Sequence, residues 1–538
     1  MQRWNGWGDE SLSLNLPSRA ETMLTELLGP GRPRQSASLD TVLAGVPPSR
    51  LREHPLISTD AEPRLRHARG QSLPDWVALR FGQLDSFPDG VAFPQDEDQV
   101  RELINLARQG GWSLIPYGGG SSVLGHVTPV PGSRPVLTVS MAGMDRLQDF
   151  SQTSLTATFQ AGVTGPQLEA SLQERGCTLG HFPQSFEFST LGGWVATRSS
   201  GQQSLGYGSI KAMFRGGRVV TPSGDLTVPA VPSSAAGPDL REVILGSEGR
   251  LGLLTTVAVQ VSPTPERERF HAFILPDWDR GVDAVRSLVQ NRIPLSMIRL
   301  SNAAETRTNM AMSGHDRLVE MFNTYLRLRR IGPQGCLLLL GFSGRPRATR
   351  QAVRAALAEV RRVGRGVHLH TALGRAWHKK RFLAPYLRNV LWDLGYAVDT
   401  LETAVPWDRV TQTMNGIESG LHAGLQGAGE AVHVFSHLSH VYPTGSSIYT
   451  TVLFRLASTA EETLERWRAL KQAASRAIVA NQGTISHHHG VGLDHLHDLE
   501  PEKGRLGLSA IRSLCSSFDP QGLMNPGKLV AKPPRGQG

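Results

Sequence analysis

The sequence predicts an α+β protein built from more than one domain. Its 538 residues exceed what one ordinary hydrophobic core accommodates. Short runs rich in β-branched residues alternate with helical patterns along the chain. The apolar fraction of 39% is typical of a soluble globular protein, and the longest aliphatic run, residues 336–340, is far too short to span a membrane.

Four segments are expected along the chain. Residues 1–85 mix polar, proline-rich and short helical stretches, which predicts a helical segment that wraps around the rest. Residues 86–263 and 264–478 are each predicted to form an α+β domain. Residues 479–538 form a C-terminal segment that ends in a turn-dense element.

The first α+β domain begins with a short strand at residues 91–93, which Pro94 ends. Asp96 can cap the helix that follows, because Val100, Leu103 and Ile104 recur at helical spacing. A helix is predicted at 167–175, and further strands are predicted at 112–115, 137–141, 154–159, 218–220 and 254–261.

The second α+β domain shows the same alternation. Strands are predicted at 270–275, 336–342 and 447–456, and helices at 278–291 and 347–363. No repeat of solenoid period is present.

The net charge and the cysteine content indicate which partners and which cellular compartment to expect. The formal net charge of +9 favours an anionic partner, but no nucleic-acid-binding signature is present, so we expect no nucleic acid. Cys177, Cys336 and Cys515 form no CxxC pair, which favours a reducing compartment. The N-terminus lacks an apolar segment of signal-peptide type, and the C-terminus, 535–538, is no peroxisomal address; a cytoplasmic protein is expected.

Two glycine-rich stretches indicate a ligand site. The first covers residues 115–123, and the second covers 186–201 and is followed by a glycine-bearing element at 246–252. Glycine permits close approach of the backbone to a ligand and positive φ angles that turn N–H groups toward phosphate. No GxGxxG opens a βαβ unit and no Walker A sequence occurs, so neither a Rossmann fold nor a P-loop is expected.

These stretches resemble the FAD-binding domain of the vanillyl-alcohol-oxidase superfamily. Residues 91–94, 116–123, 162–165, 191–193 and 246–249 match it in order and spacing. The resemblance implies that 86–263 binds FAD, that 264–478 is a cap domain for substrate, and that 479–538 completes the flavin site.

The resemblance also implies which residues bind the cofactor. The first loop would bind the pyrophosphate, and the later stretches would line the ribityl chain and the isoalloxazine. No histidine or cysteine stands where relatives carry covalent flavin, so the FAD is expected to be non-covalent, and His126 is interpreted as a surface or turn histidine. The implied cofactor-binding residues are Pro116, Tyr117, Gly118, Gly119, Gly120, Ser121, Ser122, Gln184, Ser185, Phe186, Glu187, Phe188, Ser189, Thr190, Thr197, Arg198, Ser199, Ser200, Glu248, Gly249, Arg250, Leu251, Gly252, Leu253 and Leu254.

A run of three histidines, His487–His489, is the strongest feature outside the glycine loops. Three adjacent side chains cannot all face one way on a helix or strand, so at least one should point into a pocket while another packs behind it. Histidine suits proton transfer at neutral pH. His437 and His440 have metal-ligand spacing, but the surrounding sequence departs from the metal motif of flavin-dependent 2-hydroxy-acid dehydrogenases; no metal is expected.

The histidine run is also part of a longer resemblance, to the alkyldihydroxyacetonephosphate synthase family, which covers nearly the whole chain. The matching stretches are 4–8, 188–198, 298–300, 402–403, 406–409 and 486–492. The resemblance implies that Tyr449, Arg299 and His487–His489 are catalytic. It implies that Arg388 binds the substrate phosphate, for which a guanidinium is well suited.

The implied reaction exchanges the fatty acid of acyl-dihydroxyacetone phosphate for a fatty alcohol, without net redox change, in ether-lipid synthesis. The expected partners are these two substrates, an anionic membrane surface on which the enzyme sits peripherally, and a second copy of the chain. Two alternatives remain open: an FAD-dependent D-2-hydroxy-acid dehydrogenase or oxidase, and a flavin-retaining binding protein without catalysis.

Overall fold

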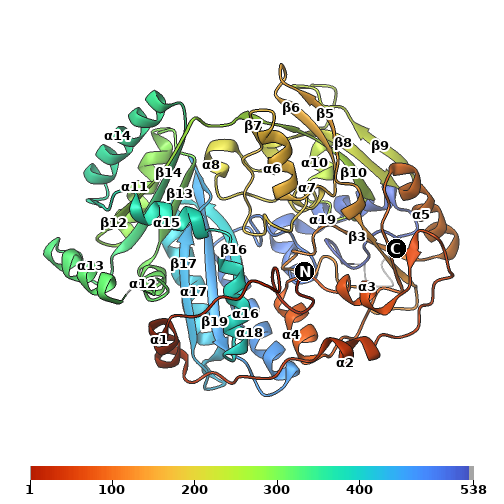
Figure 1. Ribbon diagram of the computed structural model, residues 1–538, viewed down its shortest axis with the longest axis horizontal. Coiled ribbons are helices and arrows are strands. Elements are labelled where there is room, and N and C mark those ends of the chain that lie inside the picture. Colours follow the sequence, from red (N-terminus) through yellow and green to blue (C-terminus); the bar gives the residue numbers. More distant parts are fainter. Residues whose placement is uncertain (1, 315, 532–538) are drawn as a thin grey trace.

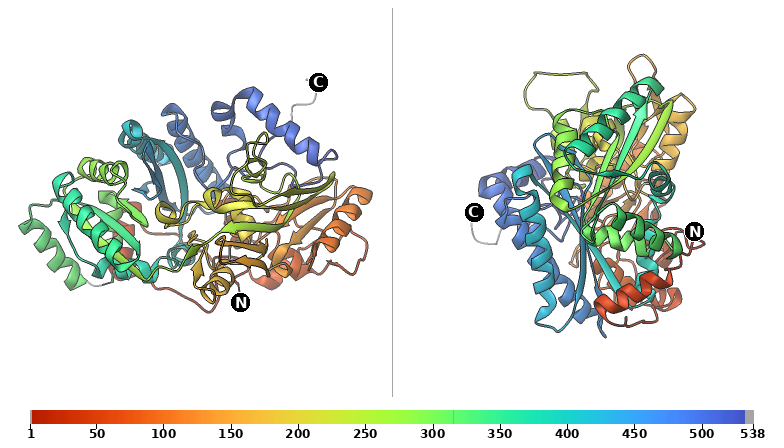
Figure 2. Two further views of the ribbon diagram at one scale, coloured as in Figure 1. Left: turned by 90° about the horizontal axis from the view of Figure 1, so that it is seen from above. Right: turned by 90° about the vertical axis from the view of Figure 1, so that its left-hand side faces the viewer.

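The computed structural model describes residues 2–314 and 316–531. Within these ranges the strands form four sheets, which confirms the α+β class. Seen from above, strands β1–β11 (orange to yellow-green) and strands β12–β19 (green to blue) lie toward opposite ends of an elongated molecule (Figures 1 and 2). We refer to these as the first and second lobes.

A four-stranded sheet of order β1-β2-β4-β3 opens the first lobe. Its strands β2, β4 and β3 run parallel, and helix α5 (Glu97–Gly110) connects β2 to β3. Asp96 caps α5 by accepting the Gln99 N–H, as predicted, and the helix buries Val100, Leu103 and Ile104 against the sheet. The strands are β1 (Ile57–Ser58), β2 (Gly90–Ala92), β3 (Ser113–Tyr117) and β4 (Val136–Ser140).

A five-stranded antiparallel sheet of order β5-β6-β10-β8-β9 completes the first lobe. Phe159, Phe214 and Val257 project from it into a core shared with helices α6 and α7. The elements are β5 (Leu147–Ser151), β6 (Thr156–Gln160), α6 (Gly165–Gln173), β7 (Cys177–Thr178), α7 (Leu191–Thr197), α8 (Ser204–Tyr207), α9 (Ile210–Met213), β8 (Phe214–Thr221), β9 (Gly224–Val228), α10 (Arg241–Ile244), β10 (Leu253–Gln260) and β11 (Ser262–Pro263).

The second lobe is an antiparallel sheet of order β15-β12-β14-β13-β17-β19-β16, with β18 paired to β19. Alternate residues of each strand face opposite sides. Leu338 and Leu340 of β14 therefore pack under helices α11, α14 and α17, whereas Leu339 faces the other side, toward α15. The strands are β12 (Arg267–Leu275), β13 (Met297–Ser301), β14 (Cys336–Gly344), β15 (Val367–His368), β16 (Tyr396–Pro406), β17 (Val432–Leu438), β18 (Val441–Tyr442) and β19 (Gly445–Arg455).

Helices cover both faces of this large sheet (Figure 1). Helix α18 packs along α17, and α16 carries Arg388 toward the space between the lobes. The helices are α11 (Trp278–Gln290), α12 (Ala303–Ala311), α13 (Asp316–Leu328), α14 (Pro346–Arg362), α15 (Ala372–Lys380), α16 (Leu387–Asp393), α17 (Val410–Gln426) and α18 (Ala460–Ala480).

The two ends of the chain close the structure. Trp7 and Asn389 exchange two hydrogen bonds, which attach the N-terminal segment to α16. After helix α19 (Glu500–Phe518) the chain returns to β3, where Leu114 bonds to Leu523 and Asn525. The remaining helices are α1 (Ser18–Leu28), α2 (Leu39–Ala44), α3 (Ala61–Arg66) and α4 (Leu73–Phe81).

The predicted strands and helices are present with small shifts at their ends. In the described ranges the sequence patterns missed ten strands, of which β16 and β17 are the longest: β1, β5, β7, β9, β11, β13, β15, β16, β17 and β18. None of the helices in the described ranges combines the length and apolar character needed to cross a bilayer. The C-terminal residues 535–538, on which the absence of a peroxisomal address was argued, lie outside the described residues.

Candidate active site

A cavity of about 560 Å³ lies between the two lobes. Both glycine loops line it on one side, and the large sheet lines it on the other. Apolar residues of α1 close its far end. The cavity thus joins three regions: a glycine-rich cradle, a cluster of titratable side chains, and an apolar channel.

The two glycine loops touch each other directly. A Cβ on Gly118 would lie 2.4 Å from Thr190 Oγ1, and one on Gly119 would lie 1.7 Å from the Phe188 carbonyl oxygen. Gly120 has a φ of +66°, which other residues rarely adopt. Glycine is therefore required at these positions by contact between the loops as well as by the backbone angle.

Most of the predicted cofactor residues line this cavity. The cavity-lining ones are Pro116, Tyr117, Gly118, Gly120, Ser121, Ser122, Gln184, Ser185, Ser189, Thr190, Thr197, Ser199, Ser200, Glu248, Gly249, Gly252, Leu253 and Leu254. The others are Gly119, Phe186, Glu187, Phe188, Arg198, Arg250 and Leu251. Two of these have partners elsewhere, because Arg198 pairs with Glu242 at 2.6 Å and Arg250 donates to the Met524 carbonyl.

His126 is a turn residue, but the expectation that it lies on the surface is wrong. It is buried beneath the first glycine loop, with Nδ1 2.6 Å from Ser122 Oγ and Nε2 3.2 Å from Glu248 Oε2. The same Glu248 carboxylate accepts the N–H groups of Val491 and Gly492. His126 therefore belongs to the contact that ties the first lobe to the histidine run.

Three strands of the large sheet present a row of polar side chains. Glu402 on β16 pairs with Tyr449 on β19, and Tyr449 pairs with His437 on β17. Residues directly opposite in an antiparallel sheet share a face, so the three side chains lie next to one another. The rings of His437 and Tyr449 are stacked, with centroids 4.8 Å apart.

Arg299 on β13 is held by an internal carboxylate. Its Nη2 lies 2.7 Å from Glu305 Oε1, and its Nη1 lies 3.0 Å from His437 Nε2. Burial alone would raise the pKa of Glu305, but the charge of Arg299 and the contact with His437 outweigh burial and lower it to about 2. Burial, reinforced by Arg299, lowers the pKa of His437. Glu305 is thus ionised and compensates Arg299.

Arg388 has no such partner. Its guanidinium stacks on Trp76 at 4.4 Å, and Nη1 donates to the Gln71 carbonyl. Nε and Nη2 are closed off from solvent and have no hydrogen-bond acceptor among the described residues. Burial lowers the pKa of Arg388 to about 10, so the side chain is still charged at neutral pH.

Asp399 and Asp75 are the carboxylates whose charges act most strongly on Arg388, and both are bound by other groups. Asp399 accepts the Trp467 Nε1–H at 2.7 Å and lies 3.6 Å from Lys471 Nζ. Asp75 is bound by Ser72 and Thr128. Because Arg388 lines the cavity, its uncompensated charge favours an anion there.

The histidine run lies in a loop beside the row. His488 and His489 line the cavity, whereas His487 does not. The His487 Nε2 instead lies 2.6 Å from Tyr442 Oη. This agrees with the expectation that one histidine faces a pocket while another packs behind it. Glu402, His440, His487 and His488 bring their polar atoms within 4.8 Å of one another.

Tyr449 lines the cavity and interacts electrostatically with both arginines. Burial raises its pKa to about 12, so the phenol is protonated at neutral pH. The His489 ring lies 6.0 Å from it in an edge-on contact. Burial holds the pKa of His489 well below its ordinary value.

An apolar channel leads away from this cluster. It is lined by residues of α1 and α16 and of strands β16, β17 and β19 of the large sheet. The same side chains form a buried apolar cluster around α1. The channel residues are Leu16, Ala20, Met23, Leu24, Met312, Leu387, Leu391, Val398, Phe435 and Leu453.

Sequence reasoning gave no role to Glu305, His437 or Glu402. The alternating pattern Val432-His433-Val434-Phe435 is a strand signal that would have placed His437 on the large sheet. Glu305 stands three residues after Asn302, which caps α12 through the Glu305 N–H. Its proximity to Arg299 depends on tertiary structure.

Comparison with known proteins identifies the parts of the chain. Residues 88–228 match the family model "FAD binding domain", and residues 264–529 match "FAD linked oxidases, C-terminal domain". The cavity fits such a cofactor, since the buried Gln202 Oε1 and Asn525 Oδ1 beside the glycine loops have no partner among the described residues. The chain is an FAD-dependent enzyme.

The whole chain also has full-length relatives. It is 30% identical to an alkyldihydroxyacetonephosphate synthase of Dictyostelium discoideum, over 98% of this chain and 93% of that protein. It is 31% identical to one of Trypanosoma brucei brucei, over 89% and 79%. A solved alkyldihydroxyacetonephosphate synthase structure superimposes with a TM-score of 0.84 at 26% identity, over 98% of this chain and 97% of that one. The chain belongs to the alkyldihydroxyacetonephosphate synthase family.

Proposed function

We propose that this enzyme exchanges the fatty acid of acyl-dihydroxyacetone phosphate for a fatty alcohol and so forms an ether lipid precursor. The observation that carries the proposal is the unpaired Arg388 guanidinium in the same cavity as Tyr449 and the apolar channel. A substrate with a phosphate at one end and a long alkyl chain at the other matches this arrangement, in the described structure, of an uncompensated cation and an apolar channel.

The cofactor is FAD, and we propose that it is bound non-covalently in the glycine-rich cradle. When bound, its isoalloxazine ring supplies an electrophilic centre that can take up an electron pair from a substrate carbon. The three cysteines are buried and none lines the cavity in the described ranges. Small residues such as Ser121, Ser122 and Thr190 leave room for the ring system and its phosphates.

Each polar side chain of the cavity has a role in this proposal. Arg388 holds the phosphate through its guanidinium. Tyr449 and the histidine run move protons between the substrate carbon and the departing carboxylate. They lie side by side, and burial raises the pKa of Tyr449 while it lowers the pKa of His489. Arg299 faces the same space and stabilises negative charge that develops there.

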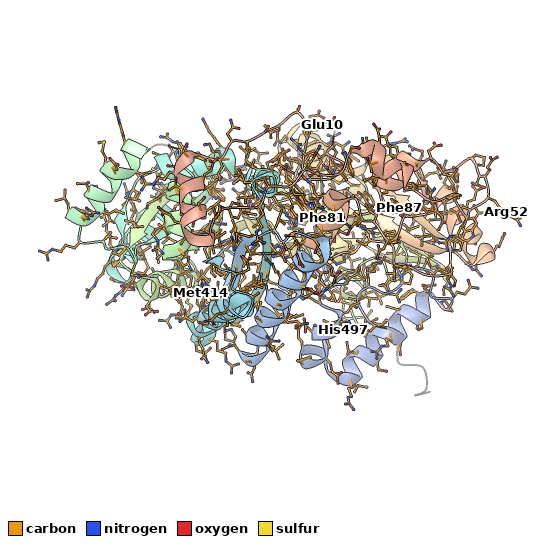
Figure 3. All side chains as sticks on the ribbon, turned by 90° about the horizontal axis from the view of Figure 1, so that it is seen from below. Glu10, Arg52, Phe81, Phe87, Met414 and His497 are labelled. Carbon is orange, nitrogen blue, oxygen red and sulfur yellow. The ribbon has the colours of Figure 1, made fainter. Side chains whose placement is uncertain are left out.

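The lipid substrates suggest that the enzyme works at a membrane, and one surface suits this. Helix α13 exposes Met321 (69%), Leu328 (78%) and Tyr325, and α1 exposes Leu27. Both helices project at the same end of the molecule (Figures 1 and 3), and Gly314 before α13 lies against Pro17 before α1. The exposed residues of 327–330 include three arginines. An apolar face with basic neighbours at the channel end fits an anionic bilayer.

A substrate exchange assay tests the reaction. Purified protein with FAD, acyl-dihydroxyacetone phosphate and labelled fatty alcohol should give labelled ether product, with the flavin remaining oxidised. Bleaching of the flavin by a D-2-hydroxy acid, with no ether formed, would contradict the proposal and favour a dehydrogenase. Bound FAD with neither activity would indicate a binding protein.

A vesicle assay tests the surface. The variant Met321→Glu/Leu328→Glu should sediment less with vesicles that contain anionic phospholipid, while it keeps its activity on short-chain, soluble substrates. The matched control Leu506→Glu changes another exposed leucine, on α19, and should sediment like the wild type. Equal sedimentation of all three proteins would contradict the assignment. Self-association of the chain stays a prediction, which the sedimentation coefficient without vesicles measures.

A further inference from the structure

Glu402 is a buried carboxylate that faces histidines. It is 2% exposed, and neither oxygen has a hydrogen bond of good geometry among the described residues. The nearest nitrogens are His488 Nδ1, in contact with Oε2, and His487 Nδ1, 3.4 Å from Oε1. Within the described ranges no lysine or arginine forms an ion pair with it.

The histidines around Glu402 shift the pKa of its carboxyl group. Burial alone would raise the pKa of Glu402, but His488 and His487 outweigh burial and hold it well below its ordinary value. A desolvated carboxylate requires a positive partner. Among the described residues, only imidazoles contact this carboxylate.

The histidines around Glu402 differ in what their second nitrogen does. His487 is engaged on both sides, with Nδ1 toward Glu402 and Nε2 on Tyr442, and its backbone N–H donates to the Glu402 carbonyl. His440 Nδ1 lies 2.9 Å from Ser204 Oγ, and burial holds its pKa well below its ordinary value. His488 has Nδ1 on Glu402 and lines the cavity, so Nε2 is its free nitrogen.

We propose that Glu402 is the positioning residue that binds His488 Nδ1 and aims its Nε2 into the cavity beside Tyr449. His488 is then the histidine of the run that exchanges a proton with the substrate, and His487 fixes the loop. A carboxylate that orients an imidazole in this way selects its tautomer and stabilises its charged form. Glu402 itself does not touch the substrate.

A metal ion is the alternative occupant of this cluster, since four potential ligands converge there. His488 Nδ1 and Glu402 Oε2 are in direct contact, so the two can share a proton without an ion. Metal analysis of the purified protein separates the two occupants. The titratable groups that face Glu402 from the surrounding elements are His437, His440, Tyr442, Tyr449, His487, His488 and His489.

The inference rests on the proposed exchange reaction, and Glu402→Gln tests it. The neutral amide should lower kcat by roughly 100-fold, the lower range for loss of general acid–base catalysis, with KM changed less than about threefold. The activity that remains should decline at lower pH on the alkaline side than in the wild type, because the imidazolium has lost its counter-charge. Wild-type kcat and an unchanged pH profile would overturn the inference; absence of ether product in the wild type would instead contradict the proposed function.

Three further variants separate positioning from folding. Glu402→Asp keeps the charge and should recover the wild-type pH profile, although kcat stays reduced. His488→Asn should match Glu402→Gln, and the double variant should lose little more, because the two residues act as one unit. The control Glu418→Gln removes a half-buried carboxylate, bound by Ser436 and Asn302 outside the cavity, and should leave the pH profile unchanged. Additive losses in the double variant would overturn the coupling.

Two measurements without substrate complete the test. In NMR of protein with ¹⁵N-labelled histidine, one imidazole should carry its proton on Nδ1 in the wild type and should lose this tautomer preference in Glu402→Gln. Metal analysis of the purified holoenzyme should find less than about 0.1 divalent ion per flavin. A stoichiometric ion whose removal by chelation abolishes activity would overturn the proposal in favour of a metal site.

Discussion

Two arginines face the same cavity but differ in how their charge is compensated. Arg299 is bound by Glu305 and His437, 2.7 and 3.0 Å away, so its charge is neutralised within the protein. Arg388 rests on the face of Trp76 and leaves two N–H groups without an acceptor in the described structure. A buried cation without a partner is unfavourable unless a ligand supplies one.

The difference separates two tasks within one site. Arg299 can adjust the electrostatics of the reaction without binding a full anionic ligand, since Glu305 already holds it. Arg388 can bind such a ligand but contributes little until it arrives. Tyr449 interacts electrostatically with both arginines. Variants that alter either arginine should therefore change different kinetic constants.

The largest effect is expected for Tyr449→Phe, which leaves both arginines in place. Loss of the hydroxyl should reduce kcat roughly 100- to 10,000-fold, the range for a group that transfers a proton, with little change in KM. Steady-state kinetics with both substrates measures this. Near-normal turnover would show that the arginines and histidines act without the phenol.

The next largest effect is expected for Arg388→Met, which should weaken binding of the phosphorylated substrate. Methionine keeps the apolar length against Trp76 but removes every donor, so KM for the phosphorylated substrate should rise roughly 30-fold or more, as for a lost charge-assisted pair of about 2 kcal/mol. Arg388→Lys should recover part of this. If Arg299→Met raised KM equally and left kcat intact, the proposed division between the two arginines would fail.

Glu305→Gln removes the compensation of Arg299 and should reduce stability by about 2 kcal/mol, since hydrogen bonds to charged groups contribute about 1.5–3 kcal/mol. Because Glu305 has a folded-state pKa of about 2, below the ordinary 4.5, its contribution is present above pH 4.5 and is lost as the pH falls toward 2. Urea unfolding at pH 6 and pH 3 measures this. The stability gap between wild type and variant should be narrower at pH 3, and an equal gap would contradict the assignment.

Inorganic phosphate should give the smallest effect. At ten times its Kd a ligand adds about 1.4 kcal/mol, so phosphate should raise the thermal midpoint of the wild type by a few degrees in a saturable manner. Arg299→Met should respond like the wild type, and Arg388→Met should not respond. Stabilisation that persists in Arg388→Met would place the anion site elsewhere.

The sequence predicted the local features of this molecule better than its long-range contacts. Strand and helix patterns, the cap at Asp96 and the glycine loops depend on neighbouring residues, and the structure contains them. The arrangement of Glu402, Tyr449 and His437 depends on the register of three strands that local patterns only partly revealed. The resemblance to a family named Tyr449 and Arg388, but the partners of those residues came only from the structure.

His126 is a second residue whose environment could not be predicted from its neighbours in the sequence. A histidine after a glycine loop has the sequence surroundings of an exposed turn. It is buried because Val491 and Gly492, distant along the chain, bring Glu248 and the histidine loop onto it. Burial that depends on another segment has no local signal.

The row on the large sheet also has a consequence for how the enzyme becomes active during folding. Arg299 and His437, which contact each other, are 138 residues apart, and their strands meet only when the central pairing of the sheet is complete. Long-range strand pairing is slow compared with the closing of local loops. Refolding chains should therefore bind flavin in the first lobe before they recover enzyme activity. An intermediate that contains flavin but is inactive is the expected sign of this order of assembly.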